Sequence, residues 1–83
     1  MDYLKKNREP EPFNGHPSWQ FWNVFLWISD DYDLYHEAVD LIDRYGNAAA
    51  SEILFRELQG HRTPDGALFS RAAIRNAIKC LPK

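Results

Sequence analysis

The chain has 83 residues, of which 14% are aromatic, and its formal net charge is −2. A chain of this length forms one small domain with a dense core, and its single cysteine, Cys80, excludes an intramolecular disulfide framework and a cysteine-based zinc site. No apolar run approaches the roughly 20 residues of a membrane span, so we expect a cytoplasmic protein with no membrane partner.

The charges are distributed unevenly along the chain. Residues 1–55 contain four basic and ten acidic groups, whereas residues 56–83 contain six basic and two acidic groups. Such an asymmetry can steer a charged partner to one end of a molecule. It is also compatible with ordinary surface charge.

Residues 1–12 are polar, and Pro10 and Pro12 favour an extended backbone over a helix. We therefore expect an extended or flexible arm at 1–12, followed by a single helical domain at 13–83. The dipeptide Asn14-Gly15 predicts a turn, and Ser18 is a suitable cap for the helix that follows it.

The first helix is predicted at residues 19–28, which contain all three tryptophans. Apolar side chains surround most of this helix, as is typical of a helix in the middle of a domain. We expect the tryptophans in the core; the alternative is a partly exposed aromatic patch that docks a protein. The polar side chains here form a predicted polar slot, which consists of Asn14, His16, Gln20 and Asn23.

Asn23 is the most informative residue of this slot, because a buried amide without a hydrogen-bond partner costs about 1–3 kcal/mol. We expect it to pair with a turn backbone or with a side chain of the second helix. A structural hydrogen bond and a ligand contact are the two interpretations of its role.

Ser29-Asp30-Asp31 is predicted to end the first helix and to cap the start of a second, which runs to about Tyr45, with Gly46 at its end. Its outer face carries four carboxylates, at Asp33, Glu37, Asp40 and Asp43. This acidic face is either a surface that mimics nucleic-acid phosphates and binds a basic protein or an ordinary solvated face.

The third helix is predicted at residues 48–58 and the fourth at residues 71–81, capped by Ser70. Between them, Thr63-Pro64-Asp65-Gly66 predicts a tight turn, and Leu68 and Phe69 are expected to fill the core. Positions i, i+4 and i+8 of the last helix are basic. Together with their neighbours they form a basic face that fits nucleic acid or an acidic partner: Arg62, Arg71, Arg75, Asn76 and Lys79.

These elements predict an all-α fold, a compact bundle of four short helices with the N-terminal arm outside it. The residues show no spacing typical of a catalytic triad, a phosphate loop or a metal cluster, and the three histidines are scattered. We therefore expect a non-enzymatic protein with no cofactor, no catalytic residues and no metal site.

Two resemblances accompany these patterns. The segment 50–81 resembles the helix-turn-helix, DNA-binding segment of large serine recombinases, and the matching residues are Leu58, Gly60, Thr63-Pro64-Asp65-Gly66, Phe69-Ser70, Arg71, Ile74 and Arg75. This resemblance implies that the last helix is a recognition helix, with Arg71, Arg75 and Asn76 at base edges and Lys79 at phosphate.

The second resemblance covers residues 13–81. The pattern Asn14-Gly15-His16-x-Ser18-Trp19-x-x-Trp22-Asn23-Val24-x-Leu26-Trp27-Ile28, followed by Leu34-Tyr35, is similar to a family of small proteins from phages and mobile genetic elements. This family implies an anti-defence protein in a bacterial host cell, comparable to an inhibitor of CRISPR effectors. We therefore expect stoichiometric binding to a host protein or ribonucleoprotein complex through charged helix faces, with a small helix-turn-helix DNA binder as the alternative.

Overall fold

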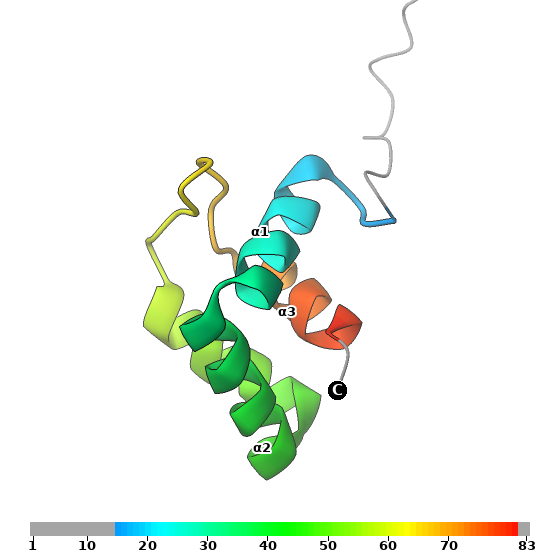
Figure 1. The fold of residues 1–83 in the computed structure, drawn as a ribbon, viewed down its shortest axis with the longest axis vertical. Coiled ribbons are helices and arrows are strands. Elements are labelled where there is room, and N and C mark those ends of the chain that lie inside the picture. Colours follow the sequence, from blue (N-terminus) through cyan, green and yellow to red (C-terminus); the bar gives the residue numbers. More distant parts are fainter. Residues whose placement is uncertain (1–14, 82–83) are drawn as a thin grey trace, which may run out of the picture.

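The computed structural model describes residues 15–81, and within them the chain is all-α. The expected arm at 1–12 lies outside the described residues. The helices are α1 (Trp19–Asp30), α2 (Tyr32–Leu58) and α3 (Arg71–Cys80), as Figure 1 shows. Residues 59–70 join α2 to α3, and an isolated antiparallel bridge connects Arg62 to Leu68 in this connection.

Each helix begins at a short polar side chain that the sequence identified as a cap. The hydroxyl of Ser18 accepts a hydrogen bond from the amide of Phe21, and that of Ser70 accepts one from the amide of Ala73. The carboxylate of Asp31 accepts from the amide of Leu34. These bonds satisfy amides that lack a helical acceptor, so the three predicted helix starts are confirmed.

The predicted number of helices is wrong. The two helices expected up to Tyr45 and at residues 48–58 belong to the single element α2, which kinks at Gly46. The reason is that Gly46 alone takes a non-helical conformation, with φ 87° and ψ 168°, and the helix resumes at the next residue. Figure 1 shows the result as a V whose two halves lie on either side of the kink.

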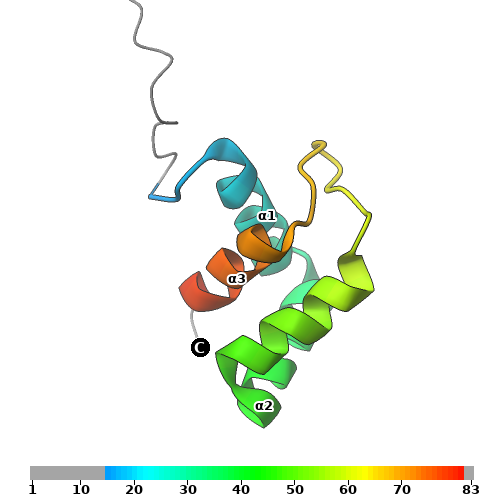
Figure 2. The same cartoon turned by 180° about the vertical axis from the view of Figure 1, so that it is seen from behind.

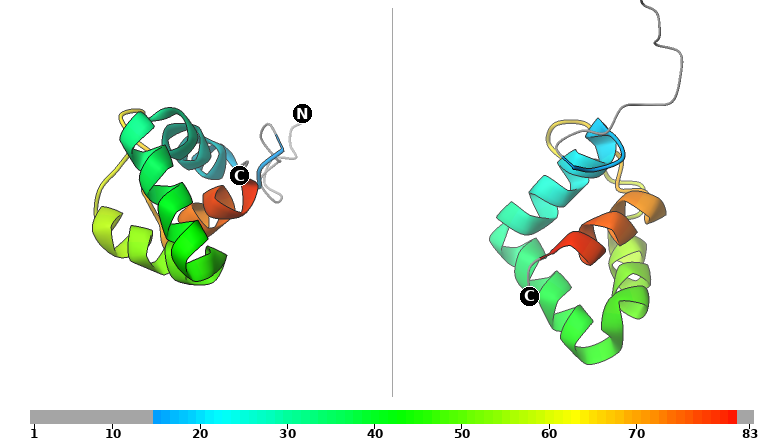
Figure 3. Two further views of the ribbon diagram at one scale, coloured as in Figure 1. Left: turned by 60° about the horizontal axis from the view of Figure 1, so that its bottom comes forward. Right: turned by 90° about the vertical axis from the view of Figure 1, so that its right-hand side faces the viewer.

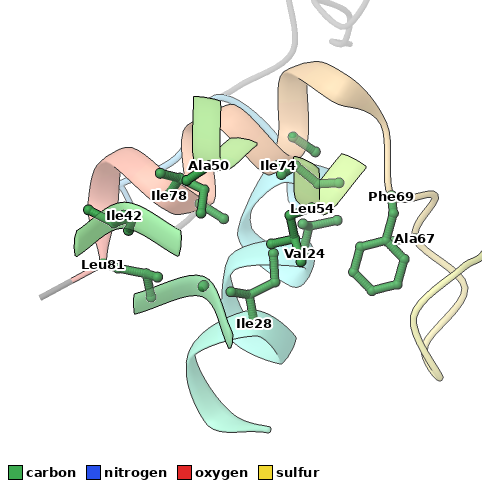
Figure 4. Close-up of a cluster of buried hydrophobic side chains, with 13 residues drawn as sticks. Val24, Ile28, Ile42, Ala50, Leu54, Ala67, Phe69, Ile74, Ile78 and Leu81 are labelled. Carbon is green, nitrogen blue, oxygen red and sulfur yellow. The ribbon is translucent and has the colours of Figure 1, made fainter. Parts of the chain in front are cut away.

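Helix α3 packs against both α1 and α2 (Figures 2 and 3). Its inner side chains, Ala73, Ile74, Ala77 and Ile78, are buried as the periodicity predicts. They meet buried side chains of the other helices, as drawn in Figure 4: Val24, Ile28, Ile42, Ala50 and Leu54. The buried Phe69 joins this core, whereas Leu68, expected there too, is 37% exposed.

The expectation that all three tryptophans lie in the core is wrong. Trp19 is 43% exposed, and Trp22 and Trp27 are half-buried. Only Asn23, Val24 and Ile28 of α1 are buried, because α3 and α2 cover one side of this helix and leave its other side near the surface. The alternative of an aromatic docking patch therefore retains Trp19 alone as a well-exposed tryptophan.

Candidate partner-binding surfaces

The acidic face lies on the first half of α2. Asp33, Asp40 and Asp43 are exposed there, and Glu37 is half-buried. Asp40 forms an exposed ion pair with Arg44, with 3.1 Å between the carboxylate oxygen and Nε. The negative charge available to a partner is therefore greatest at Asp33 and Asp43.

Glu37 differs from its neighbours because it shares a hydrogen bond with Glu57, on the second half of α2. This hydrogen bond, together with burial and the repulsion from Glu57, raises the pKa of Glu37 to about 7. The kink at Gly46 folds the two halves together and makes this contact possible. No local sequence pattern indicates this contact, because the two carboxyls are 20 residues apart.

We expect the free energy of unfolding to decrease as the pH rises from about 5 to about 8, because the folded state holds a proton on Glu37 that the unfolded chain releases. The loss should be about 1 kcal/mol, since water screens a carboxyl that remains partly exposed. Glu37→Gln keeps a hydrogen-bond donor and should remove this loss, whereas Asp43→Asn should retain it. Urea denaturation at both pH values measures the effect, and an equal loss in wild type and Glu37→Gln would contradict the assignment.

The basic face divides into two groups. Arg62 donates from Nη1 to the carbonyl of Gly66, 3.0 Å away, and so braces the connection between α2 and α3. Arg71, Arg75 and Lys79 lie on α3 and line one cavity of about 640 Å³ together with Asn76. Of the four predicted cations, Arg71, Arg75 and Lys79 therefore lie together at the cavity, and Arg62 lies in the connection between α2 and α3.

These three cations are held differently. The Nε of Arg71 lies 2.9 Å from a carboxylate oxygen of Glu52, and its guanidinium lies 4.6 Å from the centre of the Phe55 ring. Arg71 is thus fixed against α2 rather than free to reach a base edge. Arg75 and Lys79 are exposed and form no ion pair within residues 15–81.

The predicted polar slot is divided between two places. Asn76 and Nδ1 of His16 are 2.9 Å apart, and the His16 ring packs against Phe25 with 4.7 Å between centroids. Gln20 instead donates to the carbonyl of Leu68, at 2.8 Å. His16 and Gln20 therefore do not share a site. Asn14 lies outside the described residues.

Asn23 anchors the turn at residues 63–66 to α1. Its carbonyl oxygen accepts from the hydroxyl of Thr63 at 2.6 Å, and its amide donates to Asp65 at 2.9 Å. Trp27 donates to the same carboxylate oxygen of Asp65 at 3.0 Å. The hydrogen bonds from Asn23 and Trp27 lower the pKa of Asp65. Structural hydrogen bonds therefore account for both polar atoms of the Asn23 side chain. Its partners are the turn side chains Thr63 and Asp65, and not a turn backbone or a side chain of the second predicted helix as expected.

Residues 15–81 contain no group of three or more metal-ligating side chains that could hold an ion, and none of their helices has the length and apolar character to cross a membrane. Comparisons with protein-family models, curated proteins and solved structures give no significant match. The two charged surfaces of residues 15–81 are therefore the candidate binding sites.

Proposed function

We propose that the chain is a non-enzymatic interaction protein that inhibits a host defence or nucleic-acid-processing complex by stoichiometric binding. The observation that supports this proposal is the acidic face of α2, where three exposed carboxylates and the half-buried Glu37 share one side. A CRISPR effector or a comparable bacterial machine is the target that the resemblance of the sequence pattern to small phage proteins would imply.

The spacing of the acidic face suits a groove that normally holds nucleic acid. Asp33 and Asp43 are ten residues apart, which corresponds to about 15 Å along a helix. One strand of duplex DNA carries a phosphate every 3.4 Å or so along the axis, which gives about four charges over that length. Asp33, Asp40 and Asp43 place three carboxylates over that length, and this density of charge is lower than that of a DNA strand, because Glu37 shares a hydrogen bond with Glu57 and Asp40 pairs with Arg44. Charge of this sign still complements a basic groove, and complementary charges accelerate and orient association.

Neutralising the exposed part of this face should abolish or greatly weaken binding. The test uses Asp33→Asn, Asp40→Asn and Asp43→Asn in one variant, whose net charge rises by three. Wild type and variant are compared by affinity capture from a bacterial lysate, and then by calorimetry with the purified partner. We expect a stoichiometric complex with wild type and a loss of affinity of about tenfold or more in the variant.

A matched control carries the same rise in net charge elsewhere on the surface. It combines three substitutions at exposed positions outside the acidic face: Ala49→Lys, Gln59→Lys and His61→Lys. We expect this control to bind and inhibit as wild type does. If both triple variants lose affinity equally, or if the neutralised variant still inhibits the purified target, the acidic face is not the binding surface.

DNA binding through α3 is the second candidate, and the common cavity of Arg71, Arg75 and Lys79 favours it. The net charge of −2 and the acidic half of α2 oppose it, because a duplex extends well beyond one short helix. A gel shift at low salt that disappears in the Arg71→Ala, Arg75→Ala variant would establish this candidate in place of the first.

A further inference from the structure

Three elements form the cavity that holds the basic side chains. Pro17 and Phe21 contribute from the start of α1, and Asn47 and Ala48 from the residues that directly follow the kink of α2. The remaining wall is α3. Its volume of about 640 Å³ lies within the range of pockets that enclose small ligands or short chain segments.

The cations of α3 form a regular row along this cavity. Arg71, Arg75 and Lys79 are four residues apart, so successive side chains are separated by about 6 Å along the helix axis. Glu52 and Phe55 hold the first of them in place. The other two have no acidic partner within the described chain and remain available to a ligand.

An extended peptide presents charge with almost the same period. Alternate side chains of an extended strand lie on one side and are about 6.6 Å apart. Carboxylates at every second position would therefore face the row in register. Two of them would meet Arg75 and Lys79, and the third would share Arg71 with Glu52. The side chains between them would point away from α3, toward the other walls of the cavity, whose apolar members are Pro17, Phe21 and Ala48.

We propose that this cavity binds an extended segment of a protein partner that carries Asp or Glu at every second position. A short acidic segment is favoured over single-stranded nucleic acid, because its charges end where the cavity ends. A long polyanion would also meet the acidic half of α2, and among residues 15–81 only one aromatic ring, that of Phe21, lines the cavity for base stacking.

The test measures fluorescence anisotropy of a labelled peptide with three glutamates at alternate positions, added to the full chain. A second peptide has the same composition with its three glutamates adjacent, and a third has glutamine in their place. We expect the alternating peptide to bind at least about fivefold more tightly than the clustered one, since only its charges match the row. The glutamine peptide should not bind.

Two variants with the same change in net charge separate the cavity from general electrostatics. Arg75→Glu with Lys79→Glu alters the cavity, and Arg44→Glu with Arg56→Glu alters exposed positions of α2 outside it. The first should lose affinity by about tenfold or more, and the second by about twofold or less. Arg75→Gln with Lys79→Gln provides a milder variant that should show the same loss if charge reversal disturbs α3.

Several results would overturn the proposal. These are no binding of the alternating peptide, equal binding of the clustered peptide, equal losses in the two double variants, and tighter binding of an oligonucleotide with the same number of charges. Self-association of the chain that the cavity variant abolishes would assign the cavity to a second copy instead. The variant with a neutralised acidic face should bind the peptide as wild type does, because the acidic face and the cavity are separate surfaces. Failure of wild type to bind the peptide would therefore leave the proposed function standing.

Discussion

Asn23→Ala is expected to lower the free energy of unfolding by about 2–3 kcal/mol, because it removes the partner of two groups at once. Asn23 is 1% exposed and Thr63 is 3% exposed, so water does not replace the lost bonds freely. The hydroxyl of Thr63 would lose its acceptor, and Asp65 would lose one of its two donors. Urea denaturation followed by tryptophan fluorescence measures the change.

Gln20→Ala is the matched control, since Gln20 lies on the same helix and bonds to the same connection through the carbonyl of Leu68. It is half-exposed, so its loss should cost less than about 1 kcal/mol. A double-mutant cycle between Asn23 and Thr63 should give a coupling of about 1 kcal/mol or more, because the two side chains touch. Equal effects of Asn23→Ala and Gln20→Ala, or no coupling in the cycle, would contradict the anchoring role of Asn23.

Gly46→Ala is the second substitution with a large expected effect, about 1–3 kcal/mol. The combination of φ 87° and ψ 168° is accessible almost exclusively to glycine. A Cβ atom built at this position meets no atom within 4 Å, so the cost comes from the backbone and not from a clash. Calorimetry should show a melting temperature lower by roughly 4–24 °C, at about 4–8 °C per kcal/mol for a domain of this size.

A D-alanine at position 46, introduced by chemical synthesis, is the control for this explanation. The mirror image of the observed conformation lies in the extended region that L-residues adopt readily, so D-alanine should fit without strain. We expect its stability to equal or exceed that of the natural chain. A similar loss with both alanine enantiomers would mean that position 46 requires a small side chain rather than a positive φ.

Local hydrogen bonding explains which parts of the fold the sequence predicted well. A cap connects residues three apart, so Ser18, Ser70 and the run Ser29-Asp30-Asp31 that contains the third cap could be identified from the chain alone. The inner face of α3 follows in the same way from the spacing of its apolar side chains. These features depend on short stretches of sequence and not on how the helices pack.

Contacts between distant residues explain what the sequence could not predict. Asp65 appeared only as a turn residue, yet it binds side chains that lie 42 and 38 positions earlier. The row of charges on the second predicted helix indicated an acidic face, but it did not indicate that Glu37 meets Glu57. The ion pair between Arg71 and Glu52 likewise joins two helices that are separate in the sequence. The exposure of Trp19 likewise depends on which side of α1 the other helices cover.

Amide hydrogen exchange of the chain with and without its purified partner tests the proposed function most directly, because it locates the interface. We expect a one-to-one complex in which protection increases across residues 33–43, on the first half of α2. The triple Asn variant should show no such protection at the same concentrations. Protection confined to residues 71–79, with the first half of α2 unchanged, would contradict the acidic face as the binding surface.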